Sequence, residues 1–314
     1  METNKKVLIT GSIAYDRIMN FPGYFKDNIL PDQIHNLNVS FFVDKFRESF
    51  GGTGGNIAYN LSLLETNFLT WANVGNDFEN YKQWFLKNNI GISKIKIFKD
   101  KKTASAYIIT DQADNQIAGF FPGAMMESIS LKLISLKNIN LAIVAPQNPI
   151  DMVELPLLFK ENEIAYIFDP GQQVASLNGE QLKQSISKSK ALIGNDYEIK
   201  LIQRKTKWTL ANLQKETKML IITLGERGSK IYTKNKEYNI NPAEAENTSD
   251  PTGAGDAYRA GLIMGLIKNW SPQKIGQFAG LIAVYTVEKY GTQTHSFNWK
   301  ELEKRYRQNF NEKL

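Results

Sequence analysis

Short apolar runs separated by longer mixed stretches dominate the second half of the chain. The runs LAIVAP, AYIFDPG, KALIGN and MLIITLG follow one another from Leu141 onward and are rich in branched and aromatic side chains. Stretches that mix polar and apolar residues, such as DMVELPLLFKE and NGEQLKQSISK, lie between them. Buried strands that alternate with helices form parallel βαβ units. This half therefore predicts an α/β fold with a doubly wound, mostly parallel sheet flanked by helices.

The first half follows this pattern only in part. An apolar run at residues 7–10 precedes Gly11 and predicts a buried strand. The stretch NLNVSFFVDKF alternates partially and predicts strands exposed on one face, and residues 104–110 and 116–121 flank the turn-prone DQADN and predict a β-hairpin. We therefore expect two units: a large α/β domain made of residues 1–16, 51–100 and 122–314, and a small β lid made of residues 17–50 and 101–121.

Composition limits the possible chemistry. The chain has 314 residues, of which 42% are hydrophobic and 22% charged, as in an ordinary globular protein with a buried core. It has no cysteine, which excludes disulfides, thiolate zinc sites and a cysteine nucleophile. His35 and His295 are its only histidines, so a histidine-based metal site or triad is not expected.

Charge and hydropathy indicate where the protein acts. The opening METNKKVLIT has too short an apolar run for a signal peptide, and no run approaches about 18 apolar residues, so we expect a cytoplasmic protein without membrane contact. The net charge of +6 comes from scattered lysines and arginines. No basic block suggests a nucleic-acid partner, and the positive balance suits an anionic phosphate ligand.

The stretch DPTGAGDAYR, residues 250–259, leads into a predicted helix over residues 255–267. Gly253, Ala254 and Gly255 can present successive backbone N–H groups at the start of this helix, where the helix dipole also favours an anion. Asp256 would repel a resting anion, but it suits a general base that takes a proton from a hydroxyl attacking that anion. The alternative is that Asp256 caps the helix and the glycines make a tight turn. Spacing alone leaves both open.

Four motifs in chain order then point to a family. DPTGAGDAYRAGL resembles the C-terminal signature of the ribokinase, or phosphofructokinase-B, family of carbohydrate and nucleoside kinases. GGTGGNIAYNLSLL, NDYE and TLGERG resemble its N-terminal glycine signature, its NxxE element and its nucleotide loop. The resemblance spans about residues 11–294 of the chain. It implies a ribokinase-like fold and ATP-dependent phosphorylation of a primary hydroxyl.

The resemblance assigns roles on the phosphate side. It makes Asp256 the base and the amides of Gly253, Ala254 and Gly255 the anion hole for the γ-phosphate. No Walker lysine motif occurs, so an amide nest and Mg²⁺ would hold the phosphates. A monovalent cation such as K⁺, bound largely by backbone carbonyls, is common beside the anion hole in this family.

The same resemblance places further residues on the nucleotide side. Asn195 and Glu198 would support Mg²⁺ through water, as suits a cation that keeps several waters. Simple helix capping by Asn195 and Glu198 is the alternative. The residues that the resemblance assigns to the nucleotide are Asn195, Thr223, Gly225 and Gly228.

On the acceptor side, Asp16 follows the first strand, where a doubly wound sheet opens its ligand crevice. In the family this aspartate accepts hydrogen bonds from two sugar hydroxyls, and Gly51, Gly52 and Asn56 line the same pocket. The alternative is a solvated turn aspartate beside a glycine hinge.

Three local features lean toward a nucleoside rather than a sugar. They are the pair Tyr258–Arg259, the stretch from Asp169 to Gln172, and QIAGFFPGAM together with YGTQTH, which resembles the bacterial adenosine and nucleoside kinase branch. If residues 116–121 form a strand, Gln116 and Phe120 share a face, and Gln116 could read a base edge while Phe120 stacks on the base. The alternative is that the aromatic residues of the lid form its own small core or a dimer contact; these are Phe41, Phe42, Phe120 and Phe121.

We predict a purine-nucleoside kinase that makes a 5′-monophosphate from ATP and acts as a monomer or homodimer. A sugar kinase acting on ribose or a fructose derivative is the alternative within the family. A non-catalytic nucleotide- or sugar-binding protein is a third reading, against which the intact Asp256 and NxxE element argue.

Overall fold

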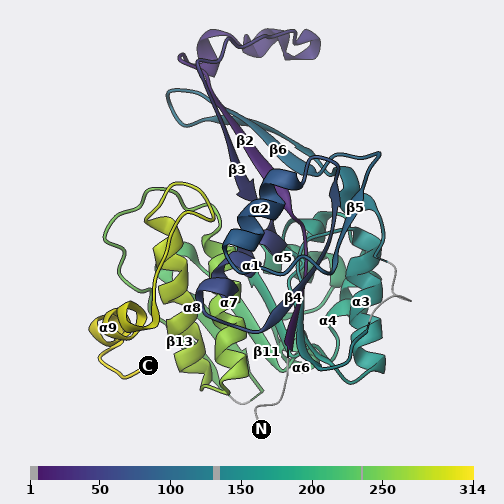
Figure 1. Cartoon of the computed structure of the whole chain (residues 1–314), viewed down its shortest axis with the longest axis vertical. Coiled ribbons are helices and arrows are strands. Elements are labelled where there is room, and N and C mark those ends of the chain that lie inside the picture. Colours follow the sequence, from purple (N-terminus) through teal and green to yellow (C-terminus); the bar gives the residue numbers. More distant parts are fainter. Residues whose placement is uncertain (1–5, 130–134, 235) are drawn as a thin grey trace.

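The computed structural model describes residues 6–129, 135–234 and 236–314. These residues form a nine-stranded sheet flanked by helices and a separate four-stranded sheet. The small sheet projects from one end of the large domain and carries two short 3-10 helices at its tip (Figure 1). The predicted α/β architecture with a small β lid is therefore confirmed.

The large sheet has the strand order β13-β12-β11-β10-β9-β8-β1-β4-β5, and its neighbouring strands pair in parallel except that β12 is antiparallel to both β11 and β13. From β1 the chain adds β4 and β5 on one side and β8 to β11 on the other. Ligands of open α/β sheets bind beyond the carboxyl ends of the strands at such a reversal. The strands are β1 (Lys6–Thr10), β4 (Phe68–Gly75), β5 (Ile95–Phe98), β8 (Ile139–Val144), β9 (Ala165–Phe168), β10 (Ala191–Asn195), β11 (Met219–Thr223), β12 (Ser229–Thr233) and β13 (Glu237–Ile240).

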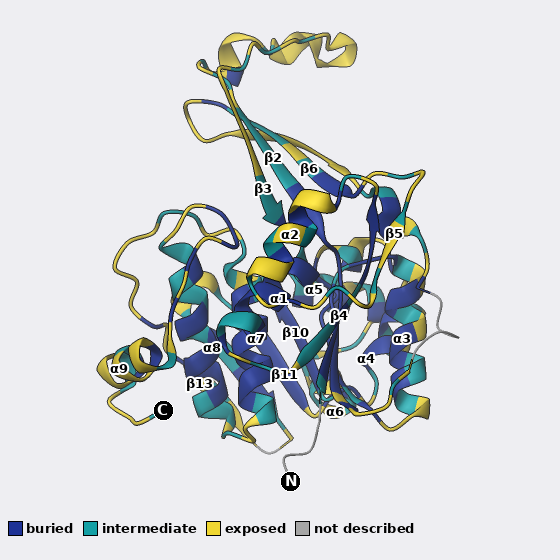
Figure 2. Ribbon diagram, viewed as in Figure 1, coloured by how far each residue is buried: buried dark blue, intermediate teal, exposed yellow. Residues whose placement is uncertain are grey.

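Helices cover both faces of this sheet, because its strands are apolar on both sides. Val7 and Ile9 pack in one core cluster and Leu8 packs in the other. The first cluster includes residues of α1 (Thr53–Leu63), α2 (Glu79–Lys87), α7 (Ala254–Ile267), α8 (Pro272–Val287) and α9 (Trp299–Phe310). The second includes residues of α3 (Pro149–Glu161), α4 (Gly179–Ile186), α5 (Asp196–Thr206) and α6 (Leu210–Glu216). Figure 2 shows the buried strands between these helices.

The lid sheet has the order β3-β2-β6-β7. Its strands are β2 (Ala14–Asn20), β3 (Lys45–Gly51), β6 (Ala104–Thr110) and β7 (Gln116–Phe121), so the predicted hairpin is confirmed. The NLNVSFFVDKF stretch, in contrast, enters a strand only at Lys45. The boundary expected after residue 16 falls inside β2, which places Asp16 on the lid sheet.

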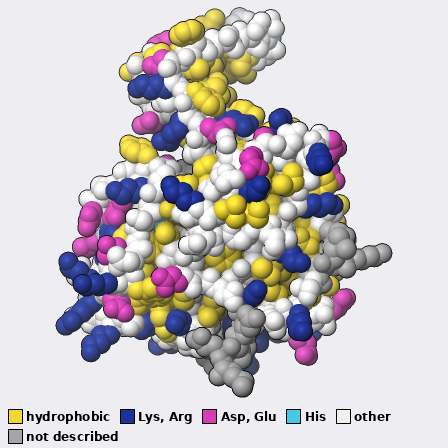
Figure 3. Space-filling model, viewed as in Figure 1, with side chains coloured by type: hydrophobic (Ala, Val, Ile, Leu, Met, Phe, Trp, Pro, Cys, Tyr) yellow, Lys and Arg dark blue, Asp and Glu magenta, His cyan; other side chains and the backbone are white. Residues whose placement is uncertain are grey.

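The surface agrees with the scattered charge seen in the sequence. Figure 3 shows lysine and arginine side chains interspersed with acidic ones on the face in view, and apolar side chains gathered on the projecting lid. No helix in the described ranges combines the length and the apolar character that crossing a bilayer requires.

Candidate active site

Asp256 lies in the first turn of α7, directly behind the glycine loop. Gly253 is the N-cap residue of this helix and has φ of 80°, a left-handed conformation that glycine adopts without strain. A Cβ atom there would come within 2.8 Å of the Thr292 methyl group. The Asp250 carboxylate holds the loop from outside by accepting from the N–H groups of Thr252 at 2.9 Å and Gly291 at 3.1 Å. Glycine is thus required where the sequence predicted an anion hole.

One amide of that loop has a weak backbone partner. The Ala254 N–H donates to the Pro251 carbonyl at 3.3 Å, which is a long hydrogen bond. All three predicted amides, those of Gly253, Ala254 and Gly255, stand at the N-terminus of a helix of 14 residues. Such a terminus favours a phosphate group through its N–H donors and its dipole.

The Asp256 carboxyl is poised for proton transfer. Burial raises its pKa to about 7, although the Arg259 charge and the hydrogen bond from Asn56 both lower it and the carboxylates of Asp169 and Asp16 raise it further. The Asn56 side-chain amide donates to Asp256 Oδ2 at 2.8 Å. No side-chain hydrogen bond caps α7, so capping by Asp256 is not what the structure shows. A carboxyl with a pKa near neutrality is suited to general base catalysis.

A buried ion pair lies beneath this carboxyl. Arg259, one turn along α7, donates from Nε and Nη2 to the two oxygens of Asp169, at 2.7 Å each. Its Nη1 donates to the Gly255 carbonyl at 3.0 Å. Burial alone would lower the pKa of Arg259, but Asp169 raises it above the usual value, so the guanidinium stays charged. The pair therefore links the end of β9 to the first turn of α7.

This pairing changes the meaning of two sequence features. The Tyr258–Arg259 pair and the stretch from Asp169 to Gln172 counted as separate signs of a nucleoside kinase. Arg259 and Asp169 contact each other, and Tyr258 hydrogen-bonds Ser229 at 2.8 Å inside the domain. These residues form structural contacts below Asp256 and do not by themselves indicate that the protein binds a nucleobase. Gln172 lies exposed in the 3-10 turn after β9, at the same edge of the sheet.

Asp16, on the lid strand β2, faces Gly51 at the end of β3. A Cβ atom at Gly51 would lie 2.2 Å from Asp16 Oδ2, so the carboxylate needs a glycine at this position. Burial and the nearby Asp250 raise the pKa of Asp16 to about 6, while Arg47 lowers it. Asp16 in turn raises the pKa of Asp256, so these two carboxylates lie near each other. Asp16 therefore lies on a strand against Gly51 and is not a solvated turn residue.

The lid sheet aligns Asp16 with a predicted base-stacking residue. Asp16 pairs with Ala106 on β6, and Ala106 pairs with Phe120 on β7. Paired residues of adjacent strands point to the same face, so these three side chains form one row across the lid. Two strand spacings separate Asp16 from Phe120, which is about 10 Å. The row thus has a carboxylate at one end, an aromatic ring at the other and a small side chain between them.

Gln116 shares that face but not that row. It pairs with Thr110 and comes four residues before Phe120 on β7. Four residues of strand extend about 13 Å, so Gln116 lies well away from the row that contains Asp16. The structure therefore places Phe120 in the row of Asp16 and leaves Gln116 toward the lid tip. This position does not favour the prediction that Gln116 contacts the edge of a nucleobase.

The remaining lid aromatics divide between a core and the surface. Phe41 packs against Phe21 and Phe25 with ring centroids 4.9 Å apart in both pairs, as a small core of the lid requires. Phe42 is 85% exposed, and Phe120 is 54% exposed. The lid-core alternative therefore holds for Phe41 and not for Phe120, which is left available to a ligand.

On the nucleotide side, Asn195 ends β10 and Thr223 ends β11, at the edge of the sheet to which Asp169 also belongs. Gly225 and Gly228 have φ of 61° and 82° in the loop that joins β11 to β12. A Cβ atom at Gly228 would lie 2.1 Å from the Ile240 carbonyl. The motif glycines thus permit a tight loop beside the carboxyl ends of these strands.

Asn195 and Glu198 form a capping box at the start of α5. Asn195 Oδ1 accepts from the Glu198 N–H, and Glu198 Oε2 accepts from the Asn195 N–H, both at 2.8 Å. The capping alternative is therefore observed. Burial and the Asp169 charge raise the pKa of Glu198, whereas the Asn195 N–H and Arg259 lower it.

These residues fit Mg²⁺ only as outer partners. No group of three or more metal-ligating side chains occurs within the ranges that the structure describes. One carboxylate already engaged in a capping box suits a cation that keeps its waters and binds mainly to phosphates. Glu198 would then orient bound water.

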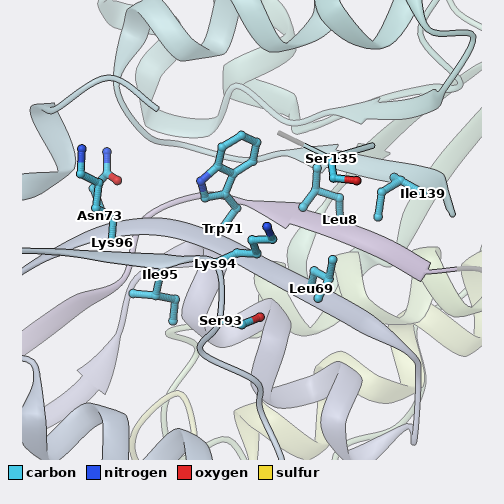
Figure 4. A pocket seen from close by; sticks show the side chains of 10 residues that line it. All are labelled: Leu8, Leu69, Trp71, Asn73, Ser93, Lys94, Ile95, Lys96, Ser135 and Ile139. Atoms are coloured by element: carbon cyan, nitrogen blue, oxygen red, sulfur yellow. The ribbon is translucent and has the colours of Figure 1, made fainter. Parts of the chain in front are cut away.

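A hollow of about 290 Å³ lies apart from these residues, beside strands β1, β4 and β5 (Figure 4). Leu8 and Ile139, which line it, belong to the core cluster that contains α3 to α6. None of its lining residues is among the predicted site residues. This hollow is therefore distinct from the candidate site around Asp256.

Sequence reasoning assigned no role to several residues that support the site. Asn56 Oδ1 lies 2.8 Å from the Thr292 hydroxyl and accepts from Gln293 Nε2 at 2.9 Å. Tyr81 and Trp84 on α2 in turn contact Gln293. The YGTQTH motif was a usable signal for Thr292 and Gln293, but no local pattern connects α2 to it.

An open α/β sheet with a separate β lid, a glycine loop at a helix start and a carboxylate directly behind it define a ribokinase-like phosphotransferase. The chain matches the model of the pfkB family of carbohydrate kinases over residues 5–300 and belongs to that family. It is therefore an enzyme that transfers a phosphoryl group to an alcohol.

Relatives carry more specific names. The chain is 30% identical over 305 residues to a nucleoside kinase of Methanocaldococcus jannaschii, with 96% of each chain covered. It superposes on the solved structure of the Burkholderia thailandensis nucleoside kinase in complex with inosine with a TM-score of 0.87 and 33% identity, covering 98% of this chain and 100% of that one. The structure of the same kinase with ADP and inosine gives a TM-score of 0.85 at 36% identity, covering 98% and 97%.

Proposed function

We propose that the protein phosphorylates the 5′-hydroxyl of a purine nucleoside with ATP as the phosphoryl donor. The row of Asp16, Ala106 and Phe120 across the lid carries this proposal. A carboxylate is suited to accept from the two ribose hydroxyls, and an aromatic ring about 10 Å away is suited to stack on the base. Ala106 leaves room between them. The named nucleoside kinases similar to this chain support the same substrate class.

The reaction follows from the placement of Asp256. Its carboxylate takes the proton of the 5′-hydroxyl as the oxygen attacks the γ-phosphorus, and ADP leaves. The amides of Gly253, Ala254 and Gly255 stabilise the charge on the transferred group, which is usually the larger contribution to catalysis. Mg²⁺ would neutralise phosphate charge when bound, with Glu198 and Asn195 as its outer partners. A K⁺ ion beside the anion hole stays a prediction.

A sugar kinase is the second candidate, because the family is one of carbohydrate kinases and Asp16 would hold a sugar as well as a ribose. Free ribose would leave Phe120 without a partner. The exposed ring of Phe120 on the substrate face therefore favours a nucleoside.

The test is a panel assay of ADP release with adenosine, inosine, guanosine, free ribose and fructose. We expect all three nucleosides, or one of them, to exceed the sugars in kcat/KM. Asp256→Asn is isosteric but cannot accept the proton, so turnover should fall about 10²-fold or more while ATP binding is kept. A preference for a sugar would establish the alternative, and no ADP release with any acceptor would point to a binding protein.

A further inference from the structure

A chain of side-chain hydrogen bonds runs from helix α2 to the base. Trp84 Nε1 donates to Gln293 Oε1 at 2.9 Å, and Gln293 Nε2 donates to Asn56 Oδ1 at 2.9 Å. Asn56 Nδ2 then donates to Asp256 Oδ2 at 2.8 Å. Gln293 and Asn56 are buried, so water does not compete for these groups. The chain joins residues from four separate parts of the sequence.

The first donor sets the direction of every bond in this chain. An indole N–H only donates, so Gln293 must turn its oxygen toward Trp84. Its amide nitrogen then faces Asn56, which must present its own oxygen there. The Asn56 nitrogen is left for Asp256. Either amide reversed would bring two donors or two acceptors together, and an unmatched buried pair is costly.

Tyr81 fixes the same direction independently. Its hydroxyl donates to the Gly51 carbonyl at 2.8 Å, so its oxygen accepts from Gln293 Nε2 at 2.6 Å. Gln293 therefore uses both N–H groups, one for Tyr81 and one for Asn56. Tyr81 also ties this chain to the glycine beside Asp16. Two residues of α2 thus specify the orientation of one amide.

We propose that Trp84 and Gln293 are positioning residues that hold the Asn56 amide with its nitrogen toward the base. The inference rests on the proposed role of Asp256. Without the chain, Asn56 could turn its oxygen to the carboxylate, and the hydrogen bond that stabilises the ionised base would be lost. Gln293 belongs to the motif YGTQTH, so the proposal gives this motif a role in catalysis.

The pH dependence shows how the proposal differs from a merely structural role. The hydrogen bond from Asn56 lowers the pKa of Asp256, so losing it raises that pKa. The base must be ionised to act, so the acid limb of kcat/KM moves to higher pH. The other charged or titratable groups around Asp256 are Arg259 on α7, Asp169 after β9, Asp16 on β2 and Tyr81 on α2. None of these is altered in the variants below.

Two variants test the proposal, with a matched control. Gln293→Met keeps the length of the side chain and adds no charge, but it can neither accept from Trp84 nor donate to Asn56, so we expect kcat to fall about tenfold to a hundredfold. Trp84→Phe keeps an aromatic ring beside Phe50 and removes the N–H donor together with one ring of the indole, and Gln293 still has Tyr81 as a partner, so a smaller fall is expected. Trp270→Phe is the control, because Trp270 follows α7 at the end remote from Asp256 and packs on Phe278. It should leave kcat unchanged.

Both variants should shift the acid limb of kcat/KM upward, with an unchanged KM for ATP. A loss of folded protein would lower kcat but would leave the acid limb of the pH profile of kcat/KM at the same pH. The pKa of Asp256 can also be followed without turnover, from the carboxyl ¹³C signal that disappears in Asp256→Asn. Wild-type kcat and an unmoved signal in folded Gln293→Met or Trp84→Phe would overturn the inference. Full activity in Asp256→Asn would instead overturn the proposed base.

Discussion

The Arg259 guanidinium and the Asp169 carboxylate form two parallel hydrogen bonds of 2.7 Å, although 90 residues separate them in the chain. The side chains are 8% and 1% exposed. Removing one partner of such a pair leaves an uncompensated buried charge and destabilises a protein by about 3–5 kcal/mol. Both residues also affect Asp256, in opposite directions, since Arg259 lowers and Asp169 raises its pKa.

Arg259→Gln and Asp169→Asn should therefore move the pH profile in opposite directions. The acid limb of kcat/KM is expected near pH 7 in the wild type, where Asp256 ionises. Losing the arginine raises the pKa of Asp256 and moves the limb up by about 1 unit or more. Losing the Asp169 charge lowers that pKa and moves the limb down. The measurement is kcat/KM from pH 5 to 9 for the nucleoside.

The matched control for this pair is Arg259→Lys, which keeps the charge but cannot reproduce the planar two-pronged bond. It should lose stability while the limb stays near that of the wild type. Shifts in the same direction for Arg259→Gln and Asp169→Asn would show that the pair only holds the fold together.

Glu198→Gln should raise the Mg²⁺ concentration needed for half-maximal activity. The neutral amide orients metal-bound water less well than a carboxylate, and such outer partners typically change metal affinity by about 10–100-fold. The amide can still accept from the Asn195 N–H, so the capping box is largely kept. A Mg²⁺ titration that coincides with that of the wild type would assign Glu198 to helix capping alone.

Asp16→Ala should raise KM for every nucleoside by about tenfold to a hundredfold, because each shares the ribose that the carboxylate is proposed to hold. A 2′-deoxynucleoside lacks one of the two hydroxyls, so its KM should rise less in Asp16→Ala. Ser49→Ala, in the position paired with Asp16 on β3, serves as the neighbouring control. If Asp16→Ala discriminates among bases but not between ribose and deoxyribose, the carboxylate contacts the base instead.

Phe120→Ala should change the ranking of adenosine, inosine and guanosine, since stacking on a base contributes about 1–3 kcal/mol and depends on the ring. Its KM for free ribose should not change. Phe42→Ala is the control, because Phe42 is 85% exposed on the lid and lies outside the strands. Equal effects of the two substitutions on all nucleosides would remove the stacking role from Phe120.

The sequence by itself determined the elements that depend on local pattern. The predicted runs at LAIVAP, AYIFDPG, KALIGN and MLIITLG became β8 to β11, and the hairpin at residues 104–110 and 116–121 matched β6 and β7. Branched apolar runs and turn residues specify such elements through near neighbours, so they can be predicted from a single chain. The antiparallel β12 and β13 were not predicted, because their mixed composition gives a weaker signal.

The glycine loop and the residue behind it could also be predicted, because the need for left-handed backbone at Gly253 and a helix start at Ala254 is local. Only the tertiary structure decided what surrounds Asp256. Asn56 reaches it from 200 residues away, and Arg259 on α7 pairs with Asp169, which follows β9. Whether a carboxylate is buried, and which groups face it, depends on contacts between distant segments, and these contacts set its pKa. The same is true of the lid, where strand register alone aligned Asp16 with Phe120 and left Gln116 outside the row.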